Sequence, residues 1–450
     1  MPPITNSSNA VVAGSVDPNL KNPTVHDWSL TIQRDMGHDI VAQVGYVGKR
    51  GMRLLRAYDP NQRKLSSEFL ASFIRARDNL LVCGDARGTA TCGQPVGLLQ
   101  SILGNSVQTN STVRTNLQRN AAGSLAAFID GNSTFFNNMV NVTGQPDFFR
   151  THPQFGDLFY MDNSADSIYH GLQIHVRRQG RNLTFGAAYT FSKSIDNGSV
   201  DPVAATSGGA VGNNSRSPTD VFNFAIDRGR SDFDRTHSFI MHAVYDLPFG
   251  RTQRWGGSQP MWLQHFIGGW TLTGILTRTT GEPWSVLSGR NTNSNRRFSR
   301  ANIVGSKPST GIFDVSGVVG PTVFDANTLA GVPQGNALTG TIFAIPEPGL
   351  NGNQGRNIFE GPSYFNLDLG ITKGFDITER WKLQFRAEMF NAFNHPNFDN
   401  PLNSTDGSTS ITSSSFARTC CASVSTPSST SLVSIGEAAR IIQLALRLSF

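Results

Sequence analysis

The 450-residue sequence lacks several features on which common protein classes depend. It contains no run of about 18 apolar residues, and this absence excludes a membrane protein built from spanning helices. Only 38% of the residues are apolar, which is low for several packed soluble cores. Residues 1–6 contain neither a basic nor an apolar stretch, so we expect no export signal there.

Signatures of catalysis and of nucleic-acid binding are also missing. No Gly-x-Ser-x-Gly elbow, phosphate-binding glycine loop or zinc motif occurs in the sequence. We therefore expect neither an enzyme nor a cofactor. The 38 basic and 32 acidic residues give a formal charge of +6, but the basic residues are scattered along the chain. A nucleic-acid partner is not expected, because such partners require a gathered basic surface.

Cysteine is scarce, and the four cysteines form two local groups. Cys83 and Cys92 lie in a polar, glycine-containing stretch, and we interpret them as a loop disulfide formed in an oxidising compartment. Cys420 and Cys421 are neighbours in another loop. No histidine accompanies either group, whereas a structural metal site needs about four well-spaced ligands. We expect no metal site.

The feature that is present is alternation of apolar and polar residues. In the terminal segment 441–450, Ile442, Leu444, Leu446 and Leu448 alternate with polar or small residues, which predicts a strand with one apolar face. Eight further segments alternate in the same way and are predicted strands: 28–33, 40–46, 172–177, 183–192, 238–247, 270–277, 365–372 and 381–389. Between 48 and 167 the alternation is lost, and only a short helix-like stretch near 65–80 is expected.

The lengths of the connections distinguish between two all-β architectures that share this alternation. The nine predicted strands are joined by connections that run short, long, short, long, moderate, long, short, long. Short periplasmic turns alternating with long external loops are typical of outer-membrane barrels. We therefore predict an all-β fold, an antiparallel transmembrane β-barrel, over residues 28–450. A soluble secreted β-protein is the structural alternative.

The strand count predicts that the chain is part of a larger barrel. Bacterial single-chain barrels normally have an even number of strands, whereas about nine are predicted here. If the last strand ends in the periplasm, the first predicted strand also runs inward from outside. Residues 1–27 are then interpreted as the polar remnant of an external loop, and the chain as the carboxy-terminal portion of the barrel.

Aromatic residues near the predicted strand ends fit a membrane position. An outer-membrane barrel carries aromatic girdles at both interfaces with water. The residues in question are Tyr189, Phe191, Tyr245, Trp270, Phe365 and Trp381. For any single one of them, ordinary core packing is an equal alternative.

Several charged residues and histidines are candidates for a site. Asp227, Asp232, Asp234, Arg228, Arg230 and Arg235 crowd one strand entrance, and Asp368, Lys382, Arg386 and Glu388 are predicted on the lumen face. The first group suits a cation or ligand site, but ion pairs that anchor a loop are favoured. His237 and His242 are predicted on opposite strand faces, which disfavours joint metal ligation. His395 is expected to cap a loop.

Several segments together resemble one family, the Oar-like TonB-dependent outer-membrane transporters of Gram-negative bacteria. They are 169–173 (YHGLQ), 188–196 (AYTFSKSID), 227–237 (DRGRSDFDRTH), 247–250 (LPFG), 269–270 (GW), 385–398 (FRAEMFNAFNHPNF) and the terminal strand. The resemblance implies a barrel of about 22 strands around an amino-terminal plug, energised through TonB. No plug and no TonB-contacting segment is recognised in this sequence.

The resemblance also implies a location, partners and a function. The location is the outer membrane, and the partners are outer-membrane lipid, the barrel assembly machinery through the terminal Phe450, and the TonB complex through a plug alone. The implied function is energised uptake of an unidentified bulky substrate. The alternatives are a surface-exposed adhesive or binding barrel without transport, and a nonfunctional fragment.

Overall fold

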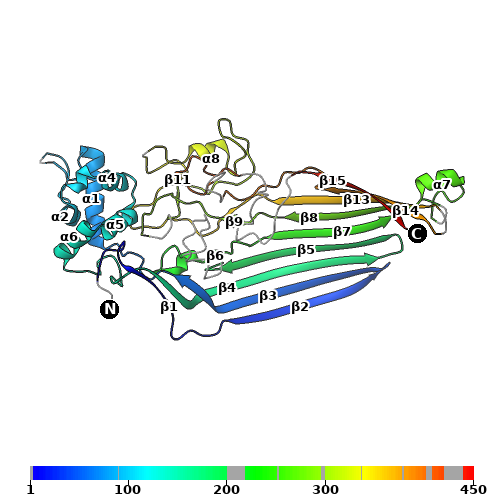
Figure 1. Ribbon diagram of the computed structural model, residues 1–450, viewed down its shortest axis with the longest axis horizontal. Coiled ribbons are helices and arrows are strands. Elements are labelled where there is room, and N and C mark those ends of the chain that lie inside the picture. Colours follow the sequence, from blue (N-terminus) through cyan, green and yellow to red (C-terminus); the bar gives the residue numbers. More distant parts are fainter. Residues whose placement is uncertain are drawn as a thin grey trace.

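The computed structural model describes residues 4–89, 91–199, 218–250, 253–294, 299–335, 337–377, 380–401, 408–419 and 439–449. Its main feature is one long, twisted sheet, with the long connections gathered at one end of the strands (Figure 1). No helix of the described residues is both long and apolar enough to cross a membrane.

The sheet follows the chain in an antiparallel meander. Its strands, in chain order, are β2 (Thr24–Gly37), β3 (Ile40–Tyr58), β4 (Phe155–Gln179), β5 (Leu183–Asp196), β7 (His237–Asp246), β8 (Trp270–Thr279), β13 (Tyr364–Asp376), β14 (Lys382–Phe390) and β15 (Ile441–Ser449). Each pairs with its neighbour in this order. Among the described residues the sheet stays open, with β2 and β15 as its edges.

Two expectations about the sheet need correction. It contains eleven described strands rather than about nine, because β1 (Val11–Val16) pairs with β4 and β6 (Gly229–Arg230) pairs with β5. Residues 1–27 are not simply a loop remnant, since they hold β1 and the start of β2. β1 escapes prediction because it has only six residues and its sequence, VVAGSV, does not alternate between apolar and polar residues.

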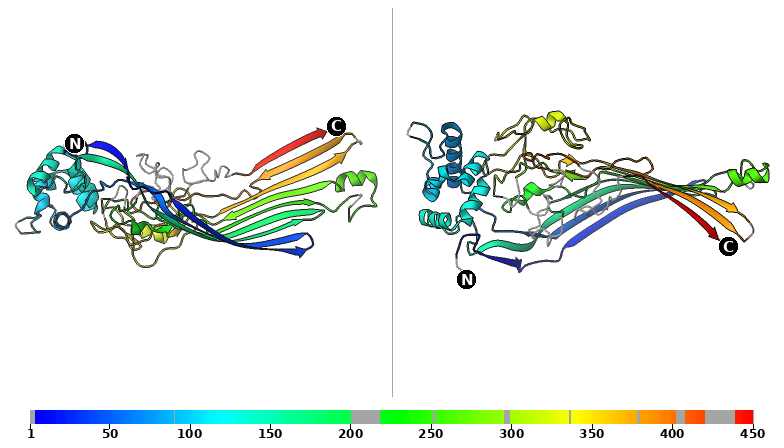
Figure 2. Two further views of the ribbon diagram at one scale, coloured as in Figure 1. Left: turned by 90° about the horizontal axis from the view of Figure 1, so that it is seen from below. Right: turned by 45° about the horizontal axis from the view of Figure 1, so that its top comes forward.

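The alternation of short and long connections is confirmed. Two residues join β2 to β3, three join β4 to β5, and a moderate connection with α7 (Met261–Ile267) joins β7 to β8, all at one end of the sheet. The long connections leave from the other end. Figure 2 shows helices α1 to α6 beyond that end, opposite to α7.

The connection from β3 to β4 folds into a helical unit, which we call the helical cap (residues 67–143). Its helices are α1 (Ser67–Cys83), α2 (Leu98–Leu103), α3 (Ser106–Thr109), α4 (Ser111–Gln118), α5 (Ala122–Gly131) and α6 (Ser133–Thr143). The expectation of one short helix near 65–80 is therefore wrong for this segment. Phe69, Phe73, Leu99 and Leu125 are fully buried in its core.

A second unit, the coil cap, consists of residues 283–360 and 408–419. Regular structure is limited to β9 (Pro283–Trp284) paired with β12 (Phe359–Glu360), β10 (Asn302–Ile303) paired with β11 (Phe343–Ala344), and helix α8 (Ala326–Ala330). Its core is aromatic, with Trp284 packed against Phe324 and Phe359 at ring-centroid distances of 5.6 and 5.4 Å. Burial of such rings stabilises a unit that has little regular secondary structure.

The two caps are in direct contact. The backbone N–H of Gly123 in α5 donates to the Asn291 carbonyl at 3.0 Å. A Cβ atom at Gly123 would lie 2.2 Å from the backbone nitrogen of Ser294, so only glycine permits this approach. Arg77 of α1 also reaches Glu347 of the coil cap, with a nitrogen–oxygen distance of 2.6 Å. The caps therefore form one layer at the long-connection end of the sheet.

Candidate functional site

The main sheet has two chemically different faces. Met241 lies in register with Ala187 of β5 and Leu276 of β8, and this row is apolar. The next residue, His242, belongs to the opposite face, which is rich in polar residues. Residues on that face include Gln173, His175, Thr190, Thr273, Asp368 and Glu388. The large apolar side chains of β15 are exposed, with Leu444 67% and Leu446 69% accessible.

The four charged residues predicted for a lumen all lie on this polar face. The side chains of Arg386 and Glu388 form an ion pair at 2.7 Å on the exposed surface of β14. Asp368 accepts hydrogen bonds from the Asn366 amide and from the backbone N–H of residue 391, both at 2.9 Å. Lys382 is in register with Ser449 of β15. These contacts are those of a solvated polar wall rather than of a compact binding site.

The six predicted girdle aromatics lie on the apolar face, and none is fully buried. Phe191 and Phe365 are near the long-connection end of their strands, and Tyr245, Trp270 and Trp381 are near the short-turn end, whereas Tyr189 lies in the middle of β5. The placement of these five in two bands favours an aromatic girdle for them over packing in a core.

The charged residues at the strand entrance are joined in ion pairs. Arg230 contacts Asp234 at 2.7 Å, and Arg228 contacts Asp166 at 3.0 Å on the exposed surface. The remaining pairs bring in residues from the coil cap and its border: Asp227 with Arg300 at 3.0 Å, and Arg235 with Glu282 at 2.8 Å. These ion pairs are those that the anchoring interpretation predicts. No described group of three or more His, Cys, Asp or Glu side chains could hold a metal ion.

Arg356 is the centre of this network. Its guanidinium contacts Asp196 at the end of β5 at 2.7 Å and Asp232 at 3.0 Å, and all three side chains are largely buried. It also donates to the backbone carbonyl of Asp227 at 3.1 Å. Because Arg356 belongs to the coil cap and Asp196 to the sheet, the pair fixes the cap on the strand ends.

The electrostatics of the network follow from burial and from paired charges. Burial by itself lowers the pKa of Arg356, but the carboxylates of Asp232 and Asp196 outweigh this effect and raise its pKa above the usual value. Burial raises the pKa of Glu282, although Arg235 opposes the shift. The network thus holds Arg356 firmly in its charged form.

The helical cap has an anchor of the same kind. Asp130, at the end of α5, is fully buried and receives Arg150 at 2.9 Å and Arg63 at 2.8 Å. Arg150 precedes β4 and also donates to the Pro153 carbonyl at 2.9 Å. Both caps are therefore attached to strand ends by buried carboxylate–arginine pairs.

The histidines do not form a shared site. His237 and His242 lie on opposite faces of β7, as predicted, and the His237 ring stacks on Tyr189 and Phe191. At His395, the expected loop cap, the backbone N–H donates to the Asn391 side-chain oxygen at 2.9 Å, and the imidazole packs edge-on against Phe365.

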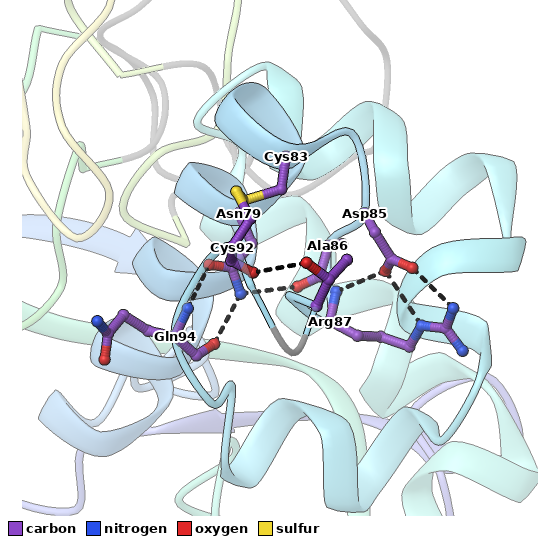
Figure 3. The surroundings of a disulfide bond; sticks show 8 residues. Asn79, Cys83, Asp85, Ala86, Arg87, Cys92 and Gln94 are labelled. Carbon is purple, nitrogen blue, oxygen red and sulfur yellow. Dashed lines mark hydrogen bonds and ion pairs between the residues drawn. A yellow bond between two sulfur atoms is a disulfide. The ribbon is translucent and has the colours of Figure 1, made fainter.

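Cys83 and Cys92 form a disulfide at the end of α1, with their Cα atoms 5.9 Å apart (Figure 3). The loop that it closes is also held by Asn79, whose amide nitrogen donates to the Gln94 carbonyl at 2.7 Å and whose oxygen accepts from the Gln94 N–H at 2.8 Å. Cys420, Cys421 and Phe450, the residue proposed as an assembly signal, lie outside the described residues.

Reduction of this disulfide is expected to open residues 84–94. In the chain-entropy account, a cross-link that closes about ten residues contributes about 2–3 kcal/mol. We expect dithiothreitol to accelerate tryptic cleavage after the exposed Arg87. The double variant Cys83→Ser, Cys92→Ser should be cleaved rapidly with or without dithiothreitol. Cleavage of the wild-type protein at one rate in both conditions would show that Asn79 alone holds the loop.

Arg150, Arg300 and Arg356 are structural anchors that the sequence did not single out. Each lies far along the chain from at least one residue that it contacts, and none belongs to a local motif. For Arg300 and Arg356, the signal in the sequence is the cluster of three Asp and three Arg residues at 227–235, and Arg150 has no such signal.

Comparisons with known proteins agree with this architecture at the level of a family. A sequence profile described as "Outer membrane beta barrel domain" matches residues 2–443. Among solved structures, the outer membrane transporter YddB from Escherichia coli is similar, with 8% sequence identity and a TM-score of 0.38. The similarity covers 97% of this chain and 34% of that chain, so the present chain spans about a third of its length. No curated protein matches.

Proposed function

Because the chain belongs to the outer membrane beta barrel domain family, we propose that its strands form part of the wall of an Oar-like TonB-dependent receptor. The protein is located in the outer membrane of a Gram-negative bacterium. In the proposed function, the receptor takes up a bulky substrate with energy supplied through TonB. The caps face the outside and the short turns face the periplasm.

The observation that carries this proposal is the difference between the two ends of the sheet. One end has short connections, and the other has two folded caps attached by buried ion pairs. A passive structural barrel needs no such layer, whereas a receptor needs a recognition surface held rigidly at its base. The polar sheet face supports the proposal as the wall along which a plug or a solute lies.

The proposed partners follow from the same arrangement. Outer-membrane lipid covers the apolar sheet face, and the barrel assembly machinery recognises the terminal strand with Phe450. The TonB complex is reached only through a plug. A surface-exposed binding or adhesive barrel without transport is the second candidate, and the two folded caps support it equally, since adhesion also requires a rigid external surface.

The length of the native polypeptide distinguishes these candidates. We expect an antibody against residues 439–449 to detect a species in isolated outer membranes more than twice as long as this chain. Mass spectrometry of that species should find peptides of a plug. A strain without TonB should retain the species in its outer membrane but lose uptake of the receptor's substrate. A membrane species of only 450 residues would contradict the transport proposal and favour the adhesive barrel. Absence of any membrane species would contradict both.

A further inference from the structure

A pocket of about 390 Å³ lies where the two caps meet. The end of α4 supplies Gln118 and Arg119, and the coil cap supplies the rest of the lining. This volume is within the range of about 300–1,000 Å³ that is usual for small-molecule sites. The two sides of the pocket are more than 100 residues apart in the sequence, so the pocket exists only when the two caps are folded and in contact.

The lining is divided into an apolar wall and a cationic end. Leu329, Val332, Ile345 and Phe416 form the wall, and the last two are buried. Arg119 and Arg290 supply two guanidinium groups. A pocket of this composition resembles the usual ligand site, in which apolar surface supplies affinity and a few polar groups supply orientation.

The hydrogen-bonding capacity of Arg290 is incompletely used. One terminal nitrogen donates to the Gly289 carbonyl at 3.0 Å and to the Thr412 hydroxyl at 3.3 Å. Its Nε–H is buried and has no hydrogen-bond partner among the described residues. A buried donor without an acceptor costs about 1–3 kcal/mol, and such groups in native proteins call for an explanation.

The charge of the pocket is also uncompensated. Within the described part of the chain, neither Arg119 nor Arg290 takes part in an ion pair, unlike the buried arginines that anchor the caps. Burial and then the neighbouring Arg119 lower the pKa of Arg290. Two like charges beside an apolar wall are unfavourable by themselves, and an anion in the pocket would relieve the repulsion.

We propose that this pocket binds an organic anion, with a carboxylate held by Arg290 and Arg119 and an apolar body against Leu329, Val332, Ile345 and Phe416. Guanidinium groups suit this role because they present planar pairs of N–H donors to a carboxylate. The inference deepens the proposed function by naming a chemical class for recognition. The inference rests on the proposed function in one respect, because it takes the cap layer to be the surface that recognises the substrate.

The binding experiment uses the native polypeptide that contains residues 1–450, placed in nanodiscs of zwitterionic lipid, and the probe 2-naphthoate, measured by isothermal titration calorimetry. The uncharged 2-naphthamide has the same aromatic body without the carboxylate. We expect 2-naphthoate to bind the wild-type protein and 2-naphthamide to bind at least tenfold more weakly. Arg290→Gln should weaken 2-naphthoate binding at least tenfold, because a charge-assisted pair is lost.

Two further variants test whether weaker binding has a cause other than the loss of a pocket arginine, such as misfolding or a general change of charge. Arg119 is exposed, so Arg119→Gln should fold normally and still weaken 2-naphthoate binding several-fold. Arg114→Gln, on the same helix but outside the lining, should bind as the wild type does. The proposal would be overturned by any one of three results: the wild type binds both probes equally, the wild type binds neither probe, or both pocket variants bind 2-naphthoate as the wild type does. Uptake is not measured here, so a failure refutes the anion pocket without touching the transport proposal.

Discussion

Replacing Arg356 by alanine is expected to destabilise the folded protein by about 3–5 kcal/mol, the usual effect of removing one partner from a buried ion pair. The truncation would leave the carboxylates of Asp196 and Asp232 buried without their cation. Their alternatives are to become protonated or to admit water, and either change loosens the coil cap from β5. The measurement is the free energy of unfolding in urea, followed by tryptophan fluorescence of the protein in lipid vesicles.

The matched control is Arg228→Ala, which removes an arginine from the same charged segment. Arg228 pairs with Asp166 at 3.0 Å, but about half of each side chain is exposed. Water screens such a pair, so the expected loss is below about 1 kcal/mol. If the two variants lost similar amounts of stability, burial would not be what distinguishes Arg356, and the anchoring role assigned to it would be wrong.

The faces of the sheet and the order of its strands could be predicted because each strand shows the alternation of apolar and polar residues in its own sequence. The hairpin predicted from 365–372 and 381–389 corresponds to β13 and β14, with boundaries at Tyr364–Asp376 and Lys382–Phe390. A side-chain period of two over eight or more residues fixes which residues share a face, whatever the partner strand. The turn between them is short, so the pairing follows as well.

The extensions of β3 and β4 were missed for a local reason. Residues 49–58 pair with residues 160–169, but the register shifts between Gly51 and Leu54 and again between Leu54 and Arg56. Such irregularities insert residues into one strand and break the period of two, although hydrogen bonding continues beyond them. A search for alternation therefore ends the strand too early.

The helical cap was missed because tertiary packing stabilises it more than local propensity does. Six of the eleven residues of helix α6 are Ser, Thr or Asn, which are weak helix formers, and α5 has only ten residues. The Asn132 side chain caps α6 by accepting from Thr134 and Phe135, and Leu125 and Phe136 are buried in the shared core. Short helices of this kind need such packing to persist.

The ion-pair anchors illustrate the limit of sequence reasoning about the site. The carboxylates at 227–234 could be recognised as a group, but Arg356 lies 160 residues from Asp196 in the chain. Charge pairing carries no periodicity and depends on which loops meet in space. One side was thus predictable for the pairs made by Asp227, Asp232 and Arg235, whereas their partners, and both sides of the Arg150–Asp130 pair, required the fold.

Replacing Met241 by arginine is expected to destabilise the protein in vesicles by about 2–4 kcal/mol, the cost of a cation on the lipid face near the bilayer midplane. Met241 is in the middle of β7, in an apolar row with Ala187 and Leu276. His242→Arg is the matched control, because it places the same charge one residue further on the polar face. Its expected effect is below about 1 kcal/mol, measured by urea unfolding in vesicles.

Tryptophan at the same two positions separates contact with lipid from packing inside a protein. Brominated acyl chains quench a tryptophan that touches them, so Met241→Trp should add fluorescence that these lipids quench, whereas His242→Trp should not. An apolar face that covered a second sheet would also reject arginine at 241, but it would shield the tryptophan from bromine. Loss of stability without quenching would therefore favour a soluble β-protein whose apolar face packs on a second sheet. Quenching at 241 alone would identify the apolar face as the surface in contact with lipid.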